Sequence, residues 1–171
     1  ELGTRTIFNV LGPLTNPAGA RAGIFGVYSH ELVRTVAEAL VALGARRAFV
    51  VHGAEGIDEL SPAGPNHVCE ILEGRIDERT IDPRDLGIER CPPGELTGGT
   101  PEANAGLAWE ILEGAHGGRR DAVLLNAAGA IAAGGHAADL EEGLHLAAAA
   151  IDSGRAAERL DALAAFSRGD T

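Results

Sequence analysis

Apolar residues recur along the chain with two different periods, and these predict a helix between two strands. From His30 to Leu43 the apolar positions follow the 3.6-residue period of an amphipathic helix, and Ser29 precedes them as a residue that offers an N-cap oxygen. The flanking runs Ala22–Tyr28 and Ala48–Val51 are short and mostly apolar, and the second is continuously so, a pattern typical of strands buried on both faces of a parallel sheet. The sequence therefore predicts a strand–helix–strand unit with short connections.

The pattern that follows predicts a hairpin and then a series of helices. Between His67 and Ile81 apolar and charged residues are interleaved around Glu73-Gly74, which predicts an antiparallel, partly solvated hairpin at or near the edge of the sheet. Residues 82–99 are rich in proline and glycine and predict a loop. The order predicts an α/β fold with a mixed, mostly parallel sheet flanked by helices. Helices are expected at residues 1–11, 100–113, 119–133, 139–151 and 155–166, with a capping box at Asp139 and Glu142.

Charge and composition exclude several classes of partner. The chain carries 25 acidic and 14 basic residues, a net charge of −11, whereas a nucleic-acid-binding protein normally presents a basic surface. The longest apolar stretch, residues 121–136, is shorter than a membrane span and contains Asn126. Cys69 and Cys91 form no CxxC pair and are too few for a disulfide framework. We therefore expect a cytoplasmic protein that binds neither nucleic acid nor a membrane.

Two adjacent carboxylates follow the second predicted strand. The segment Val51–Ser61 leaves that strand through a glycine-rich loop that bears Asp58 and Glu59. In open α/β sheets ligands bind at the carboxyl ends of the strands, and paired carboxylates suit a hard cation such as Mg²⁺ that shares a substrate phosphate. A pair of solvated loop acids is the alternative that spacing alone leaves open. His52 is expected to bond to the loop rather than to bind metal.

Other polar segments indicate no specific chemistry by composition. Residues 5–17 contain a stiff turn at Gly12-Pro13 and are typical of a structural loop. Gly94–Gly99 precedes a predicted helix and either cradles an anion or forms a plain loop. Asn104 and Asn126 lie in apolar helices, where a hydrogen bond to a loop is the ordinary role of such residues. Because no Ser/His/Asp or Cys/His arrangement can be argued, we assign no catalytic residue.

Taken together, these segments resemble one family, the anthranilate phosphoribosyltransferases. The most specific is the first, RTIFNVLGPLTNP, which looks like a signature stretch of that family. The resemblance spans nearly the whole chain and implies a nucleoside phosphorylase/phosphoribosyltransferase-like catalytic domain. The matching segments are Arg5–Pro17, Val50–Gly53 (VVHG), Gly56–Ser61 (GIDELS), Gly94–Asn104 (GELTGGTPEAN) and Asp121–Ala128 (DAVLLNAA).

The resemblance implies a reaction and a set of ligands. Members of the family convert phosphoribosyl pyrophosphate (PRPP) and anthranilate to phosphoribosyl-anthranilate and pyrophosphate, in tryptophan biosynthesis. By this analogy Asp58 and Glu59 match an acidic pair that binds Mg²⁺, with Glu59 placed to serve either of two ions, and Pro13 matches a proline that lines the passage for anthranilate. Residues 1–19 would be the end of a helical domain and a hinge, and residues 20–171 the α/β domain. Relatives form homodimers through the helical domain.

The same resemblance implies that part of the enzyme lies outside these residues. The chain begins at Glu1, contains no methionine, and lacks the family's Gly-Thr-Gly-Gly-Asp loop and its Lys-His-Gly segment. The arginine that contacts anthranilate in relatives is expected before Glu1, so Arg5 is not that residue. We therefore expect the 171 residues alone to be inactive. Two alternatives are a non-catalytic stand-alone domain of the same fold and a relative of the pyrimidine nucleoside phosphorylases.

Overall fold

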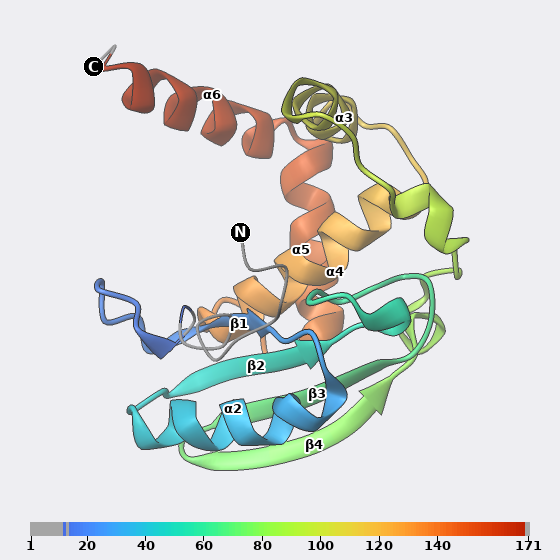
Figure 1. Cartoon of the computed structure of the whole chain (residues 1–171). Coiled ribbons are helices and arrows are strands. Elements are labelled where there is room, and N and C mark those ends of the chain that lie inside the picture. Colours follow the sequence, from blue (N-terminus) through green and yellow to red (C-terminus); the bar gives the residue numbers. More distant parts are fainter. Residues whose placement is uncertain (1–11, 13, 170–171) are drawn as a thin grey trace.

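The computed structural model describes Gly12 and residues 14–169. The helix expected at residues 1–11 therefore lies outside the described residues, as does Pro13. The strands are β1 (Ala22–Gly26), β2 (Arg47–His52), β3 (Asn66–Leu72) and β4 (Arg75–Ile81). The α-helices are α2 (His30–Ala42), α3 (Pro101–Leu112), α4 (Gly118–Ala133), α5 (Leu140–Asp152) and α6 (Arg155–Arg168) (Figure 1). Short 3₁₀ turns lie at η1 (Ala54–Gly56), η2 (Pro83–Leu86) and η3 (Pro93–Leu96).

The strands form one mixed sheet in the order β1-β2-β3-β4. β1 and β2 are parallel, as expected for a strand–helix–strand unit, while β3 pairs antiparallel with both β2 and β4. The mixed sheet and the hairpin at its edge are thus confirmed. The expectation of a mostly parallel sheet needs correction for the described residues, because β2 has one parallel and one antiparallel neighbour. Its continuous apolar run reflects burial on both faces rather than the direction of the adjacent strands.

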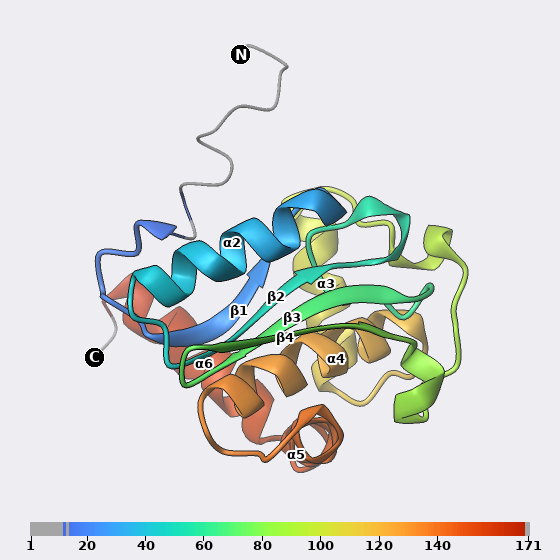
Figure 2. The same cartoon turned by 90° about the horizontal axis from the view of Figure 1, so that it is seen from below.

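Helices cover both faces of the sheet (Figure 2). Alternate residues of β2 point to opposite faces, so Val50 packs with Val33 and Val36 of α2, whereas Phe49 packs with Leu125 of α4. All of these side chains are at most 2% exposed. The 3.6-residue pattern of α2 and the apolar composition of α4 therefore place one core on each side of β2.

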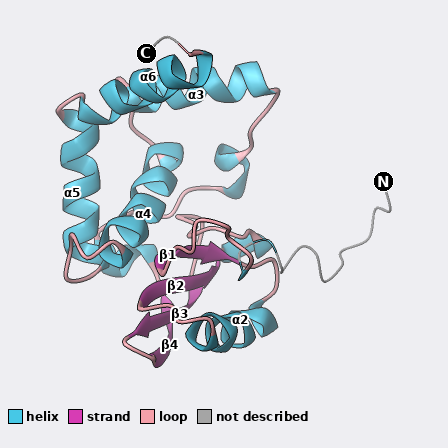
Figure 3. Cartoon of the chain, turned by 90° about the vertical axis from the view of Figure 1, so that its left-hand side faces the viewer, coloured by secondary structure: helices cyan, strands magenta, loops and turns pink. Residues whose placement is uncertain are grey.

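The C-terminal helices extend the fold away from the hairpin (Figures 1 and 3). α5 packs closely on α4, since a Cβ at Gly143 would lie 2.6 Å from the carbonyl oxygen of Ala128. A third apolar cluster, built around Ile111, Leu124 and Ile151, joins α3 to these two helices. No helix in the described ranges is both long and apolar enough to cross a membrane.

The two N-caps expected from the sequence, Ser29 and Asp139, behave differently at the starts of their helices. Asp139 caps α5 as expected, since its side chain accepts the N–H of Glu142 at 2.9 Å. The reciprocal bond is shifted by one residue, because Glu142 accepts the N–H of Ala138 at 2.6 Å. Ser29 occupies the N-cap position of α2 but makes no capping bond. Its hydroxyl donates to Glu31 at 2.9 Å instead.

Candidate functional site

The acidic segment lies at the carboxyl ends of the parallel strands. After β2 the chain makes the η1 turn, where Glu55 and Gly56 have φ values of 62° and 78°. The N–H of Gly53 then donates to the carbonyl of Ile57 at 2.9 Å and closes the loop. Asp58 and Glu59 follow with exposed side chains.

Two glycines let the backbone of the acidic segment cross the strand ends. A Cβ at Gly26, the last residue of β1, would overlap the carbonyl oxygen of Asp58. A Cβ at Gly53, just after β2, would overlap the carbonyl oxygen of Glu59. Neither glycine has a positive φ, so close approach rather than backbone conformation is what requires glycine there.

The residues after the acidic pair are buried and firmly bonded. Leu60 is 1% exposed and belongs to the core, and Ser61 is fully buried. Asn126 of α4 bonds to both the N–H and the carbonyl of Leu60, at 2.9 and 2.8 Å. The buried Asn66 accepts the N–H of Ser61 at 2.7 Å. The helix-to-loop role expected for Asn126 is thus confirmed.

The acidic side chains line a cavity of about 590 Å³. Its other walls come from the loop before α3 and from the facing sides of α3 and α4, segments far from the acids in sequence. The lining residues are Ile57, Asp58, Glu59, Leu96, Gly98, Asn104, Leu107, Ala108, Ile111, Arg119, Ala122 and Val123. The acidic pair and the Gly94–Gly99 loop, which the sequence analysis treated as separate segments, therefore meet at one cavity. Their spacing in the sequence did not indicate this.

Hydrogen bonds join the Gly94–Gly99 loop to α3 and α4. Glu95 accepts the N–H of Gly118 at 2.6 Å at the start of α4, and Arg119 donates to the carbonyl of Thr97 at 3.3 Å. Asn104 of α3 accepts the N–H of Gly99 at 2.7 Å. The Gly99 N–H is therefore already bonded to a side chain of α3 and is not free to bind an anion. This favours a plain loop over an anion cradle.

The charges in the cavity leave the acidic pair available to a ligand. Among the residues that the structure describes, the carboxylates of Asp58 and Glu59 form no ion pair and no hydrogen bond. Arg119 faces the same cavity, and its Nε finds no hydrogen-bond partner in that part of the chain. No group of three or more His, Cys, Asp or Glu side chains within the described residues is arranged to hold a metal. Any cation here would take two carboxylates and complete its shell from water or a phosphate.

His52 forms a hydrogen bond at the strand ends, although its partner is the turn after β1 and not the acidic loop that the sequence suggested. Its Nδ1 lies 2.9 Å from the carbonyl oxygen of Val27, in the turn after β1. Because a carbonyl only accepts, Nδ1 carries the proton in this bond. His52 thus joins the ends of the two parallel strands.

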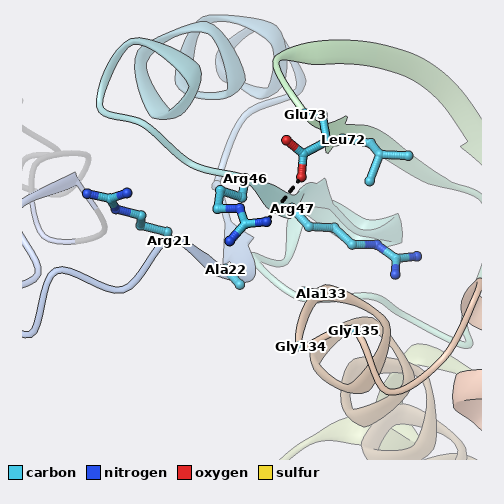
Figure 4. A pocket seen from close by; sticks show the side chains of 9 residues that line it. All are labelled: Arg21, Ala22, Arg46, Arg47, Leu72, Glu73, Ala133, Gly134 and Gly135. Atoms are coloured by element: carbon cyan, nitrogen blue, oxygen red, sulfur yellow. Dashed lines mark ion pairs between the residues drawn. The ribbon is translucent and has the colours of Figure 1, made fainter.

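A second cavity, of about 460 Å³, lies at the opposite ends of the strands from the acidic pair (Figure 4). It is formed where β1 and β2 begin, and Arg21, Arg46 and Arg47 lie around it. Arg46 pairs with Glu73 at 3.6 Å, and Arg47 donates to the carbonyls after α4, including that of Ala137 at 2.9 Å. Arg46 and Arg47 thus connect the start of the sheet to neighbouring segments, whereas ligands in open α/β sheets bind at the carboxyl ends of the strands.

The arrangement of elements, with a cavity at the carboxyl ends of β1 and β2, defines an α/β domain of the nucleoside phosphorylase and phosphoribosyltransferase type. A family model described as "Glycosyl transferase family, a/b domain" matches residues 1–157. The chain belongs to this glycosyl transferase family, as its α/β domain.

Its relatives are anthranilate phosphoribosyltransferases, which confirms the resemblance seen in the sequence. The chain is 52% identical over 166 residues to that enzyme of Pelotomaculum thermopropionicum, covering 97% of this chain and 48% of the relative. The crystal structure of the enzyme from Thermus thermophilus matches with a TM-score of 0.89 and 46% identity, covering 98% of this chain and 49% of that one. The Saccharomyces cerevisiae enzyme in complex with PRPP and Mg matches with a TM-score of 0.81 and 32% identity over 94% of this chain and 46% of that one. The chain thus spans about half the length of these relatives.

Proposed function

We propose that this chain forms part of an anthranilate phosphoribosyltransferase, a cytoplasmic enzyme of tryptophan biosynthesis. The full-length protein would transfer the phosphoribosyl group of PRPP to anthranilate and release pyrophosphate. The observation that carries the proposal is the pair Asp58 and Glu59, whose carboxylates have no partner among the described residues and line a cavity where parallel strands end. The similarity to enzymes of this name over 97% of the chain supports it.

Asp58 and Glu59 are the proposed ligands of Mg²⁺. Two adjacent oxygen ligands with room for water and phosphate fit this ion, which rarely uses a complete protein cage. The resemblance further assigns Glu59 to either of two ions. When bound, Mg²⁺ neutralises part of the charge of the departing pyrophosphate. Pro13, outside the described residues, is proposed by resemblance alone to line the anthranilate passage.

The residues of this chain would orient the reactants rather than supply a base. The amine of anthranilate attacks C1′ of the ribose while the bond from C1′ to the pyrophosphate oxygen breaks, and the leaving group takes the electron pair. Positive charge grows on the ribose, as in other glycosyl transfers. The nucleophile is a neutral aromatic amine that loses its proton after attack, so a strong base is not required. Apolar wall residues such as Leu107 and Ile111 would limit the access of water.

The remaining parts of the site are proposed to lie outside these residues. The Gly-Thr-Gly-Gly-Asp and Lys-His-Gly patterns of the family do not occur in this sequence. We therefore propose that residues 20–171 form the α/β domain, that residues 1–19 end a helical domain, and that the 171 residues alone are inactive. The full-length enzyme is proposed to be a homodimer.

The test is a double substitution in the full-length enzyme. Asp58→Asn with Glu59→Gln should raise the Mg²⁺ concentration for half-maximal activity by about tenfold or more, because both ligands are lost. Glu158→Gln with Asp161→Asn removes the same number of charges from exposed positions of α6 and should change nothing. Equal Mg²⁺ requirements in the two variants would refute the metal assignment. Turnover of thymidine with phosphate, and not of PRPP with anthranilate, would refute the proposed reaction.

A further inference from the structure

We infer that Asn126 is a positioning residue for the proposed metal site, an inference that rests on the function proposed above. Asn126 lies within an apolar part of α4, between Leu125 and Ala127. Its Nδ2 donates to the carbonyls of Leu60 and Ala122 at 2.8 and 2.9 Å, and its Oδ1 accepts the N–H of Leu60 at 2.9 Å. Both donors of the amide and its acceptor are therefore used.

These bonds fix the position of the residue that follows the acids. Leu60 comes directly after Glu59, and both of its main-chain polar groups are bonded to the same side chain. At the other end of the acidic pair, the carbonyl of Ile57 accepts the N–H of Gly53. Asp58 and Glu59 are thus the only two residues between these anchored positions. Their backbone has little freedom to move while both anchors hold.

Asn126 differs from Asn66 in what it connects. Asn66 is five residues from Ser61, and its bonds reach residues 61–64 and, at 3.4 Å, the Ile81 carbonyl of the adjacent strand β4. Asn126 is 66 residues from Leu60 and ties the acidic loop to α4. The same helix contributes Arg119, Ala122 and Val123 to the cavity. The Asn126 bonds therefore set the position of the acids relative to the opposite wall of the cavity.

The consequence concerns metal affinity more than folding. Residues that orient metal ligands through hydrogen bonds typically change affinity about 10–100-fold when they are removed. Without Asn126, the N–H and carbonyl of Leu60 would lose their hydrogen-bond partner. The Asp58 and Glu59 carboxylates would then shift from their positions in the cavity wall. Cation binding in the presence of pyrophosphate should weaken, even though Asp58 and Glu59 are intact.

The experiment compares Asn126→Ala and Asn126→Leu with Leu124→Ala in the full-length enzyme. Leu124 is 7% exposed on the same helix and packs in the cluster with Ile111, not in the one that contains Leu60. Leu124→Ala therefore lowers the melting temperature without touching the acidic loop. Mn²⁺ serves as the probe, and its binding with pyrophosphate is measured from the electron paramagnetic resonance signal of the free ion. Hydrogen exchange of residues 57–61 is measured alongside.

Both Asn126 variants should bind Mn²⁺ roughly tenfold more weakly and exchange faster at residues 57–61. Leu124→Ala should match the wild type in both measurements after its lower melting temperature is taken into account. Unchanged Mn²⁺ binding in the Asn126 variants, with weakened binding in Asp58→Asn/Glu59→Gln, would overturn this inference alone. If the double acid variant also binds Mn²⁺ normally, the metal assignment itself fails, and this inference fails with it.

Discussion

Gly26 lies so close to Asp58 that the smallest side chain at position 26 would overlap the Asp58 carbonyl oxygen. The end of β1 therefore acts as a support for the backbone of the acidic pair. The atom that would be displaced belongs to the main chain, which cannot rotate away as a flexible side chain can. A side chain at position 26 would therefore fit only if the backbone of the acidic loop moved away from the end of β1.

Gly26→Ala should consequently perturb both the fold and the site. We expect the free energy of unfolding to fall by about 1–3 kcal/mol, the usual cost of overpacking, and the affinity for PRPP with Mg²⁺ to fall as the loop shifts. Denaturant unfolding and PRPP titration of the full-length enzyme measure the two effects. Gly94→Ala is the control, because a Cβ there meets nothing within 4 Å. Equal behaviour of the two variants would show that β1 does not support the loop.

Asn66 offers a test of stability in the same loop. It is 1% exposed, accepts the N–H of Ser61 at 2.7 Å and donates to the carbonyls of Ser61 and Gly64 at 3.0 and 3.1 Å. Asn66→Ala leaves these groups unpaired, so we expect the free energy of unfolding to fall by about 1–3 kcal/mol. Asn104→Ala, whose bonds to Gly99 are exposed, should cost less in the same unfolding experiment. A smaller loss for Asn66→Ala than for Asn104→Ala would contradict this account.

The ion pair between Arg120 and Asp152 joins α4 to the end of α5. Its N–O distance is 2.6 Å, and the side chains are 6% and 59% exposed, so the arginine alone is buried. Removing Asp152 leaves a buried charge without a partner, which is costly, whereas Arg120→Met leaves only the exposed carboxylate of Asp152 unpaired. Asp152→Ala should therefore lower the melting temperature more than Arg120→Met does. The reverse order in thermal unfolding would mean that the arginine contributes mainly through packing.

Much of the fold could be predicted because its signals are local. The 3.6-residue pattern identified α2, the charged and apolar residues around Glu73-Gly74 identified the hairpin, and the Asp139 cap marked the start of α5. The direction of β3 beside β2 could not be read in this way. A continuous apolar run is typical of parallel sheets because both faces of the strand are covered, but an antiparallel neighbour covered on both faces produces the same run.

The site was predictable only in part, for a similar reason. The position of Asp58 and Glu59 after a buried strand suggested ligand chemistry, since the carboxyl ends of such strands form binding sites. The neighbours of the acids depend on contacts between distant segments. The bonds from Asn126 to Leu60 and the meeting of the acids with Gly98 arise from the packing of α3 and α4, which no spacing in the sequence encodes.

The rings of His30 and His67 form a close, tilted pair beside the strand ends, with an angle of 42° between their planes. Their ring centroids are 3.9 Å apart, with His30 at the start of α2 and His67 near the start of β3. Burial lowers the pKa of His67 below its ordinary value of 6.5, and the charges of His30 and His52 lower it further, against a smaller opposing effect of Glu78. The folded protein therefore holds His67 in its neutral form more strongly than the unfolded chain does.

This difference predicts a loss of stability in mild acid. Because the pKa is lower in the folded state, the unfolded chain binds the proton first, and the contribution of His67 is complete above 6.5 and lost as the pH falls toward the folded value. We expect the melting temperature of the wild type to drop as the pH falls below 6.5, and His67→Gln to reduce that drop. His145→Gln, at an exposed position of α5, is the matched control and should leave the slope unchanged. Identical pH profiles for His67→Gln and the wild type would show that protonation of His67 is not coupled to folding.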